Sequence, residues 1–304
     1  MVRFLTRQMF RGIDADADIP SLRKRWEKIA ARSRSIDGLR IKYVEVAGVE
    51  CEWLVPRNCG DAPVLLYLHG GAYVSGSART HRTMVSYLAK VAGMRAILPN
   101  YRLAPEDPFP CGLDDCVAVY RQLLGEGISP ENVVIAGDSA GGGMTMATLL
   151  TLREAGDPLP AAAVLISPWL DLTASGESAQ TRNEQDPLFR AEEMPKAAQH
   201  YAPVELHRDP RVSPVFADVH GLPPLLIHVG DHEILLSDST RLTQKVSEAG
   251  GSVHLKVWPE MWHVFHYFVR RMPEANRALD SMGQWLADHM GTGVKLPSRT
   301  SKAA

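Results

Sequence analysis

A serine between two glycines stands at a change of local pattern in the chain. Residues 137–141 read Gly-Asp-Ser-Ala-Gly, directly after the apolar run 133–136 and directly before a helical stretch from about Gly142. This arrangement is typical of a nucleophile elbow, a strained strand-to-helix turn that exposes the serine. A side chain at either flanking glycine would meet neighbouring backbone. The five residues alone are a weak signal, but in this context they predict that Ser139 is a nucleophile.

A second glycine-rich segment could stabilise the charge that such a nucleophile creates. The residues His-Gly-Gly-Ala-Tyr begin at His69 and follow the apolar run 64–68. Glycine amides can approach a carbonyl oxygen that becomes negative, and one such donor contributes roughly 3–4 kcal/mol. We predict that Gly70 and Gly71, with the amide of Ala140 after the serine, form this oxyanion hole. His69 is expected to brace the loop by hydrogen bonding and not to transfer protons.

The general base must be a late histidine. In proteins with such an elbow the chain order is serine, then acid, then histidine. His263 lies nearest to the end of the apolar run 253–257, where a loop at the carboxyl edge of a sheet would carry it. His266 is expected to pack in the helix that follows, and His289 to be solvated in an amphipathic terminal helix.

Three carboxylates follow the apolar run 225–229 and compete for the role of the acid. Asp238 stands between serines at a helix start, where a carboxylate usually binds free N–H groups. Asp231 directly follows the run and could be a turn residue. Glu233 has the reach needed to contact the far ring nitrogen of His263. Reach therefore favours Glu233, with Asp231 as the open alternative.

The elements that must position these residues are short apolar runs alternating with helical stretches, which indicates βαβ units around a parallel sheet. Two earlier runs, 41–46 and 49–55, are joined at Ala47-Gly48 and predict an antiparallel hairpin. We therefore predict an α/β-hydrolase fold, with a mostly parallel eight-stranded sheet flanked by helices and a helical cap. The other predicted strands, each nearly all apolar, are 64–68, 95–99, 133–136, 163–166, 225–229 and 253–257.

Two segments lie outside this pattern and predict the cap. An amphipathic helix is expected over 20–34, with Leu22 and Trp26 on its apolar stripe. Nearly sixty residues without a convincing strand separate Ile166 from Leu225, far more than an ordinary loop. The expected division is an N-terminal part of the cap, a catalytic domain in two pieces, an inserted cap segment and a flexible tail, at 1–38, 39–171 with 216–293, 172–215 and 294–304.

Composition limits the partners. The 304 residues are 45% hydrophobic, enough for a large core, and carry 33 Lys and Arg against 35 Asp and Glu, a net charge of −2. Neither nucleic acid nor an anionic membrane is expected to bind such a chain. Without a signal-peptide pattern or a run of about 20 apolar residues, we expect a cytoplasmic protein. The four cysteines are expected to be free thiols, since Cys111 and Cys116 lack further ligands for a metal.

Four motifs in this order resemble the hormone-sensitive-lipase family of bacterial esterases, over about residues 40–290. The Gly-Asp-Ser-Ala-Gly form of the elbow points to the larger subgroup. The resemblance implies Ser139 as nucleophile and His263 as base, and it again implies Gly70, Gly71 and Ala140 as oxyanion donors. The motifs are His-Gly-Gly-Ala-Tyr at 69–73, Tyr-Arg-Leu-Ala-Pro-Glu at 101–106, Gly-Asp-Ser-Ala-Gly-Gly at 137–142 and Met-Trp-His-Val-Phe at 261–265.

The chain departs from the family at the acid. Members usually have Asp-Pro-Leu after this strand, whereas here Gly230 is followed by Asp-His-Glu-Ile-Leu-Leu, with His232 where many members have aspartate. Some members use glutamate, which favours Glu233 over Asp231. The family also implies that the cap contributes to the acyl pocket. The candidates for lining this pocket are Phe4, Phe10, Trp26, Leu188 and Phe189.

The activity that the resemblance implies is two-step acyl transfer on short- to medium-chain carboxylic esters, with no metal or organic cofactor. Family members are monomers or dimers, so the resemblance allows a homodimer. A lactonase, an amidase or an aryl-ester deacetylase would use the same triad, and the motifs do not separate these activities. A non-catalytic small-ligand receptor is the alternative of another class, because plant gibberellin receptors resemble this family but lack the histidine. The presence of His263 argues against it.

Overall fold

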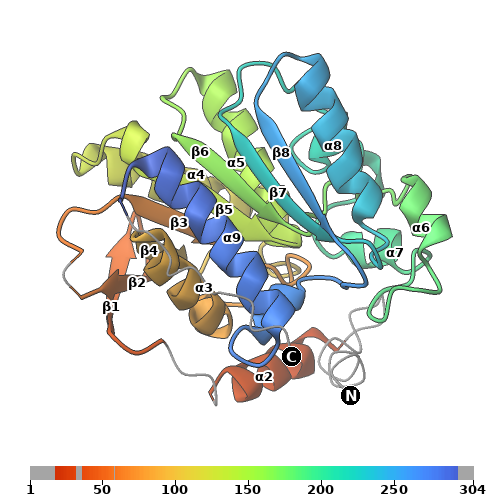
Figure 1. Ribbon diagram of the computed structural model, residues 1–304. Helices are drawn as coiled ribbons and strands as arrows, with labels where there is room; N and C mark the ends of the chain where they lie inside the picture. Colours follow the sequence, from red (N-terminus) through yellow and green to blue (C-terminus); the bar gives the residue numbers. More distant parts are fainter. Residues whose placement is uncertain (1–17, 32–35, 58, 294–304) are drawn as a thin grey trace.

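One sheet runs through the molecule, and the described residues contribute eight strands to it (Figure 1). The computed structural model describes residues 18–31, 36–57 and 59–293. The strand order is β1-β2-β4-β3-β5-β6-β7-β8, and all neighbours from β4 to β8 are parallel. The strands are β1 (Leu39–Val46), β2 (Val49–Pro56), β3 (Val64–Leu68), β4 (Arg95–Pro99), β5 (Val133–Asp138), β6 (Ala162–Ile166), β7 (Leu225–Gly230) and β8 (Val253–Trp258).

The two first strands form the predicted hairpin. Val46 pairs with Val49, and the turn between them places Ala47 and Gly48 at φ values of 53° and 79°. Two positive φ values match the twist of the flanking strands. β2 continues antiparallel onto β4 and so joins the hairpin to the parallel sheet. The predicted strands and the mostly parallel α/β architecture are confirmed.

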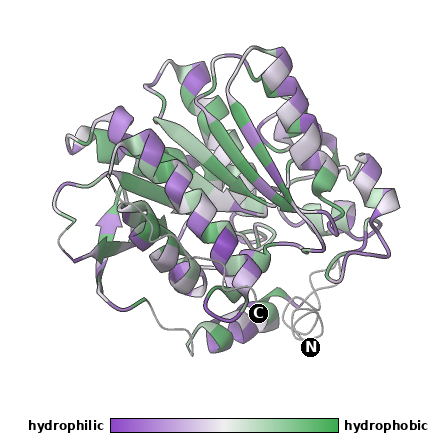
Figure 2. Cartoon of the chain, in the orientation of Figure 1, coloured by the Kyte–Doolittle hydropathy of each residue, from purple (hydrophilic) through white to green (hydrophobic). Residues whose placement is uncertain are grey.

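Helices cover both faces of the sheet. α3 and α9 pack on one face, in front of the sheet in Figure 1, while α4, α5 and α8 pack on the other. Figure 2 shows hydrophobic residues concentrated in the strands and hydrophilic ones on outward parts of the helices. These helices are α3 (Ala78–Ala92), α4 (Cys111–Gly125), α5 (Ala140–Ala155), α8 (Leu236–Glu248) and α9 (Pro273–Met290).

Successive side chains of the central strands point to opposite faces, as the pleat of a strand requires. In β3, Leu66 and Leu68 belong to the core under α4, α5 and α8, whereas Leu65 and Tyr67 belong to the core under α3 and α9. Both faces are therefore buried, which explains why the strands are almost continuously apolar. In the described ranges, no helix is both long and apolar enough to cross a membrane.

The two segments predicted to form a cap flank the same end of the sheet (Figure 1). Helix α2 (Ile19–Ala30) ends earlier than predicted, and residues 32–35 lie outside the described ranges. Its Arg23 donates to the carbonyl oxygens of Val74 and Ala104 at 2.7 and 2.8 Å, which attaches the helix to the loops of the sheet. The connection after β6 contains, without strands, α6 (Glu177–Thr181), α7 (Met194–Ala198), η2 (Val204–Leu206) and η3 (Pro214–Phe216).

Candidate active site

The serine lies on a strained turn between β5 and α5. Ser139 has φ 54° and ψ −125°, a conformation that an L-residue rarely adopts. A Cβ atom added to Gly137 would lie 2.2 Å from the carbonyl oxygen of Gly141, and one added to Gly141 would lie 2.0 Å from that of Leu68. Both flanking positions thus require glycine, as the sequence predicted. The turn leaves Ser139 half-buried among buried neighbours.

A buried histidine–carboxylate pair lies beside the serine. His263 Nδ1 is 3.0 Å from Glu233 Oε2, and the two side chains are 1% and 0% exposed. His263 and Ser139 line the same pocket, and the ring of Phe189 packs edge-on against the imidazole with centroids 4.9 Å apart. A carboxylate that accepts a hydrogen bond from Nδ1–H leaves the other ring nitrogen, Nε2, free to accept a proton. The structure therefore brings together the predicted base and acid at the predicted nucleophile.

The second oxygen of Glu233 is fixed by two donors. Its Oε1 accepts hydrogen bonds from Ser167 Oγ at 2.7 Å and from the Gly230 amide at 2.6 Å. Ser167 Oγ in turn accepts from the amide of Val264, next to His263, at 3.2 Å. Ser167 thus connects Glu233 to the loop that carries His263. Sequence reasoning missed it, although its place directly after β6, at the carboxyl edge of the sheet, was a usable signal.

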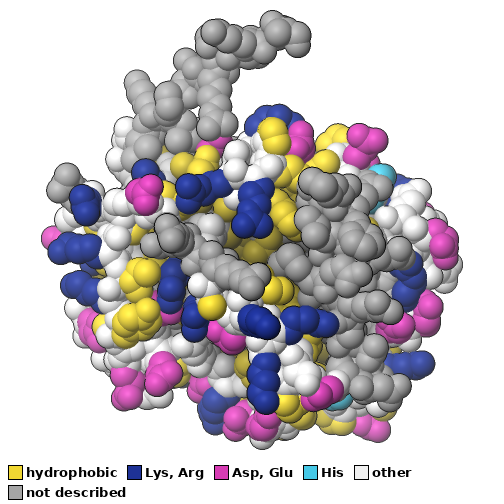
Figure 3. Space-filling view, turned by 90° about the horizontal axis from the view of Figure 1, so that it is seen from below, with side chains coloured by type: hydrophobic (Ala, Val, Ile, Leu, Met, Phe, Trp, Pro, Cys, Tyr) yellow, Lys and Arg dark blue, Asp and Glu magenta, His cyan; other side chains and the backbone are white. Residues whose placement is uncertain are grey.

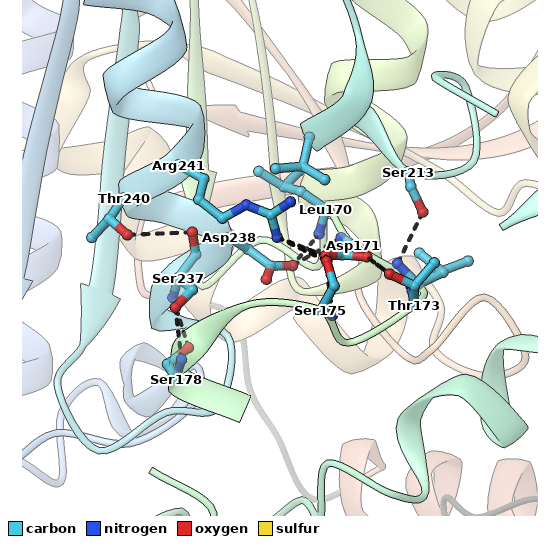
Figure 4. Close-up of polar contacts among 12 residues, drawn as sticks. Leu170, Asp171, Thr173, Ser175, Ser178, Ser213, Ser237, Asp238, Thr240 and Arg241 are labelled. Carbon is cyan, nitrogen blue, oxygen red and sulfur yellow. Dashed lines mark hydrogen bonds and ion pairs between the residues drawn. The ribbon is translucent and has the colours of Figure 1, made fainter. Parts of the chain in front are cut away.

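The competing carboxylates have other contacts. Asp231 is partly exposed, and its Oδ1 lies 3.9 Å from His232 Nε2. Asp238 is buried and its Oδ2 accepts from the amides of Leu170 and Asp171 at 2.7 and 2.9 Å (Figure 4). We expected Asp238 to bind N–H groups at a helix start; instead, it binds those of the loop after β6. Burial, and then the charge of Asp171, raise its pKa to about 8.

The other histidines have the expected secondary roles. His266 is buried in the short helix η4 (Phe265–Phe268), and burial lowers its pKa to about 3. His289 is exposed on α9 and donates to a carbonyl of its own helix. His69 donates from Nδ1 to the Gly70 carbonyl at 2.9 Å and stacks on Tyr101 with centroids 4.2 Å apart. Burial and then His81 lower its pKa to about 3, so His69 is a neutral brace.

The loop after β3 places the predicted oxyanion donors Gly70 and Gly71 in different surroundings. The Gly70 amide lies 3.2 Å from both Asp138 Oδ1 and His81 Nε2 and donates to these groups, so it is already engaged. Gly71 and Ala72, by contrast, line the pocket with Ser139, at φ values of 129° and 54°. The Asp138 carboxylate and the His81 ring bind the Gly70 amide and are the physical reason for the difference.

The pocket around Ser139 is largely apolar. Trp26 comes from α2, and Phe189 and Met194 come from the long connection, so both segments predicted as cap contribute. Figure 3 shows apolar side chains recessed among Lys and Arg side chains at this end of the molecule. Of the other predicted lining residues, Leu188 packs half-buried against the core. Phe4 and Phe10 lie outside the described residues.

No cysteine is among the described residues that line this pocket. All four cysteines are free thiols, with Cys51 and Cys116 buried. Among residues 18–31, 36–57 and 59–293, no three His, Cys, Asp or Glu side chains are grouped so that they could hold a metal ion.

Comparisons with known proteins agree with this geometry. A family model of the alpha/beta hydrolase fold matches residues 65–267. An acetyl-hydrolase of Streptomyces hygroscopicus is 44% identical over 252 residues, which cover 83% of this chain and 84% of the relative, and an esterase of Acinetobacter venetianus is 37% identical over 81% and 82%. A crystal structure of an esterase from the bacterial hormone-sensitive lipase family superposes with a TM-score of 0.89 at 40% identity, covering 95% and 98%. The chain therefore belongs to the bacterial hormone-sensitive lipase family of the alpha/beta hydrolase fold.

Proposed function

We propose that this protein hydrolyses carboxylic esters of small molecules, with Ser139 as nucleophile, His263 as general base and Glu233 as the acid. The observation that supports this most directly is the buried contact of 3.0 Å between Glu233 and His263, in the pocket where Ser139 occupies its strained turn. Relatives with the names acetyl-hydrolase and esterase point to the same reaction.

The reaction would proceed in two steps. His263 takes the proton of Ser139 as the serine oxygen attacks the ester carbonyl, and then gives that proton to the departing alcohol. A water molecule, deprotonated by the same imidazole, then cleaves the acyl-enzyme and releases the carboxylic acid. Glu233 accepts a hydrogen bond from the Nδ1–H of His263 and stabilises the imidazolium in both steps.

The oxyanion of each step would be held by main-chain amides. We assign this role to Gly71, Ala72 and Ala140, because the first two line the pocket and the third directly follows the nucleophile at the start of α5. Positive φ values at Gly71 and Ala72 are consistent with a tight turn that aims successive amides in one direction.

The substrate would be a short acyl ester. Large side chains, Trp26, Trp169 and Phe189, surround the nucleophile and leave limited apolar space. We interpret α2 and residues 172–215 as a cap, since Trp26 from the former and Phe189 and Met194 from the latter line the pocket of Ser139. An apolar wall favours alkyl acyl groups over charged ones.

The test is hydrolysis of p-nitrophenyl esters from acetate to palmitate by the wild type and by Ser139→Ala. We expect the highest kcat/KM at short chains and loss of nearly all activity in Ser139→Ala. Ser178→Ala is the matched control. Ser178 is also a buried serine, but its hydrogen bonds are to Ile234 and Ser237, so the variant should keep most of the activity. A wild type inert on every ester would contradict the proposal.

A further inference from the structure

Asp138, the residue before the nucleophile, contacts three different elements. It ends β5 and is 1% exposed. Its Oδ1 accepts from the hydroxyl of Tyr67 on β3 at 2.8 Å and from the Gly70 amide at 3.2 Å, and it lies 3.3 Å from His81 Nε2 on α3. One carboxylate oxygen therefore connects the strand of the nucleophile to the loop that holds Gly71.

The fit between this carboxylate and the loop is close. A Cβ added to Gly70 would lie 2.4 Å from Asp138 Oδ2. Burial alone would raise the pKa of Asp138, but the interactions with His81 and the Tyr67 hydroxyl hold it below its ordinary value. The carboxylate is therefore ionised in the folded protein, although it lies beside the place where a substrate oxyanion would form.

The Nδ1 nitrogen of His81, on the side of the ring away from Asp138, already has two hydrogen-bond partners. Its Nδ1 lies 3.1 Å from the Ser77 carbonyl and 2.8 Å from Thr80 Oγ1, and Thr80 donates its own hydroxyl proton to the same carbonyl. Both neighbours of Nδ1 are thus acceptors, so Nδ1 carries a proton. Nε2 lies between Asp138 and the hydroxyl of Tyr267, a residue that lines the pocket.

We propose that Asp138 and His81 are positioning residues for ester hydrolysis: the Asp138 carboxylate and Nε2 of His81 both accept from the Gly70 amide, and so they fix the amides of Gly71 and Ala72 relative to Ser139. Without His81, the Gly70 amide would lose one of its two acceptors, and the loop would be held less firmly. Without Asp138, the loop would lose its attachment to the strand of the nucleophile. The inference rests on the proposed function.

The test uses four variants of the full chain. These are Asp138→Asn, His81→Gln, the double variant, and Glu52→Gln as the matched control. Glu52 is buried and forms an ion pair of 2.5 Å with Arg82, the residue after His81, so the control loosens the same helix without contacting the loop. The measurements are kcat and KM on a short p-nitrophenyl ester and Ki for a trifluoromethyl ketone, which forms a tetrahedral oxyanion adduct.

We expect Asp138→Asn to lower kcat about 10- to 100-fold, because displaced oxyanion donors cost rates of this order. KM should change less than about twofold, and Ki should rise by the factor by which kcat/KM falls. His81→Gln should also lower kcat, and the double variant should be more active than the product of the two single effects predicts, because the two side chains hold the same amide. Glu52→Gln should keep wild-type kcat.

Three results would overturn the inference: an Asp138→Asn variant with kcat within twofold of the wild type, a loss expressed in KM alone, or an equal loss in Glu52→Gln. If Asp138→Asn does not fold, His81→Gln decides alone: a fall in kcat at constant KM supports the inference, and wild-type kcat contradicts it. A wild type that hydrolyses no ester would instead contradict the proposed function, so the two failures are distinguishable.

Discussion

Replacing Glu233 by glutamine should disable the protein without unfolding it. In the native site, Oε1 accepts from Ser167 and Gly230 while Oε2 faces His263 Nδ1. A glutamine can satisfy the first two donors only with its amide oxygen, which leaves its NH2 group toward His263. That group is a donor, so Nδ1 must become the acceptor and the imidazole proton moves to Nε2. His263 then cannot take the proton of Ser139.

The magnitude follows from this change of tautomer. A serine triad whose histidine is held in the wrong tautomer loses about 10⁴ in kcat. Since each tenfold is about 1.36 kcal/mol, the barrier should rise by about 5 kcal/mol. KM should stay within a few-fold, because Glu233 is fully buried and His263 screens it from the substrate. The two retained hydrogen bonds should keep the thermal unfolding midpoint close to that of the wild type.

The assay is steady-state hydrolysis of p-nitrophenyl acetate and butyrate, with thermal unfolding measured on the same preparations. Asp231→Asn is the control, because the Asp231 side chain is partly exposed and its near neighbour is His232. We expect this control to retain activity within about twofold. A Glu233→Gln variant with a tenth or more of wild-type kcat would refute the assignment of the acid, and so would an Asp231→Asn variant that loses activity.

Three further predictions concern the elbow, the pocket and the carboxylate of α8. Gly141→Ala should lower the free energy of unfolding by more than about 2 kcal/mol, because its Cβ would lie 2.0 Å from the Leu68 oxygen, and an unchanged urea midpoint would contradict this. Phe189→Ala should shift the preferred ester toward longer acyl chains by opening the pocket wall, and an unchanged ranking of acetate to octanoate would show that Phe189 does not limit chain length. Asp238→Asn should become more stable relative to the wild type as the pH rises. The folded protein keeps the Asp238 proton up to a pKa of about 8, whereas an unfolded carboxyl loses it near 4, so wild-type stability falls between these values by up to about 1.4 kcal/mol per pH unit. Urea unfolding at pH 5, 6.5 and 8 measures this difference, and a constant difference would contradict it.

Local patterns were sufficient to predict the fold and the strained turn that carries Ser139. The strands were identifiable because both faces of the sheet are covered, so runs such as Val64–Leu68 are entirely apolar. The elbow was identifiable because steric conflict at Gly137 and Gly141 admits no other residue. The pairing of Glu233 with His263 followed from chain order and reach, with Asp231 left open until the contact of 3.0 Å was seen.

Contacts between distant segments could not be predicted in this way. His81 reaches Asp138 across 57 residues and Ser167 reaches Glu233 across 66, and no periodicity marks such pairs. The partners of the Gly70 amide could not be predicted for the same reason, because they belong to β5 and α3. The shape of the pocket likewise depends on side chains from both α2 and the long connection, and the apolar stripe that contains Trp26 does not determine how these segments are placed.

The most direct test of the central claim is mass spectrometry of the protein quenched with acid during turnover of p-nitrophenyl acetate, followed by peptide mapping. We predict one acetyl group on the peptide that contains Ser139, absent from Ser139→Ala. Glu233→Gln should form this acyl-enzyme more slowly than the wild type. Hydrolysis that continues without acetylation of Ser139, or acetylation at another residue that persists in Ser139→Ala, would contradict it.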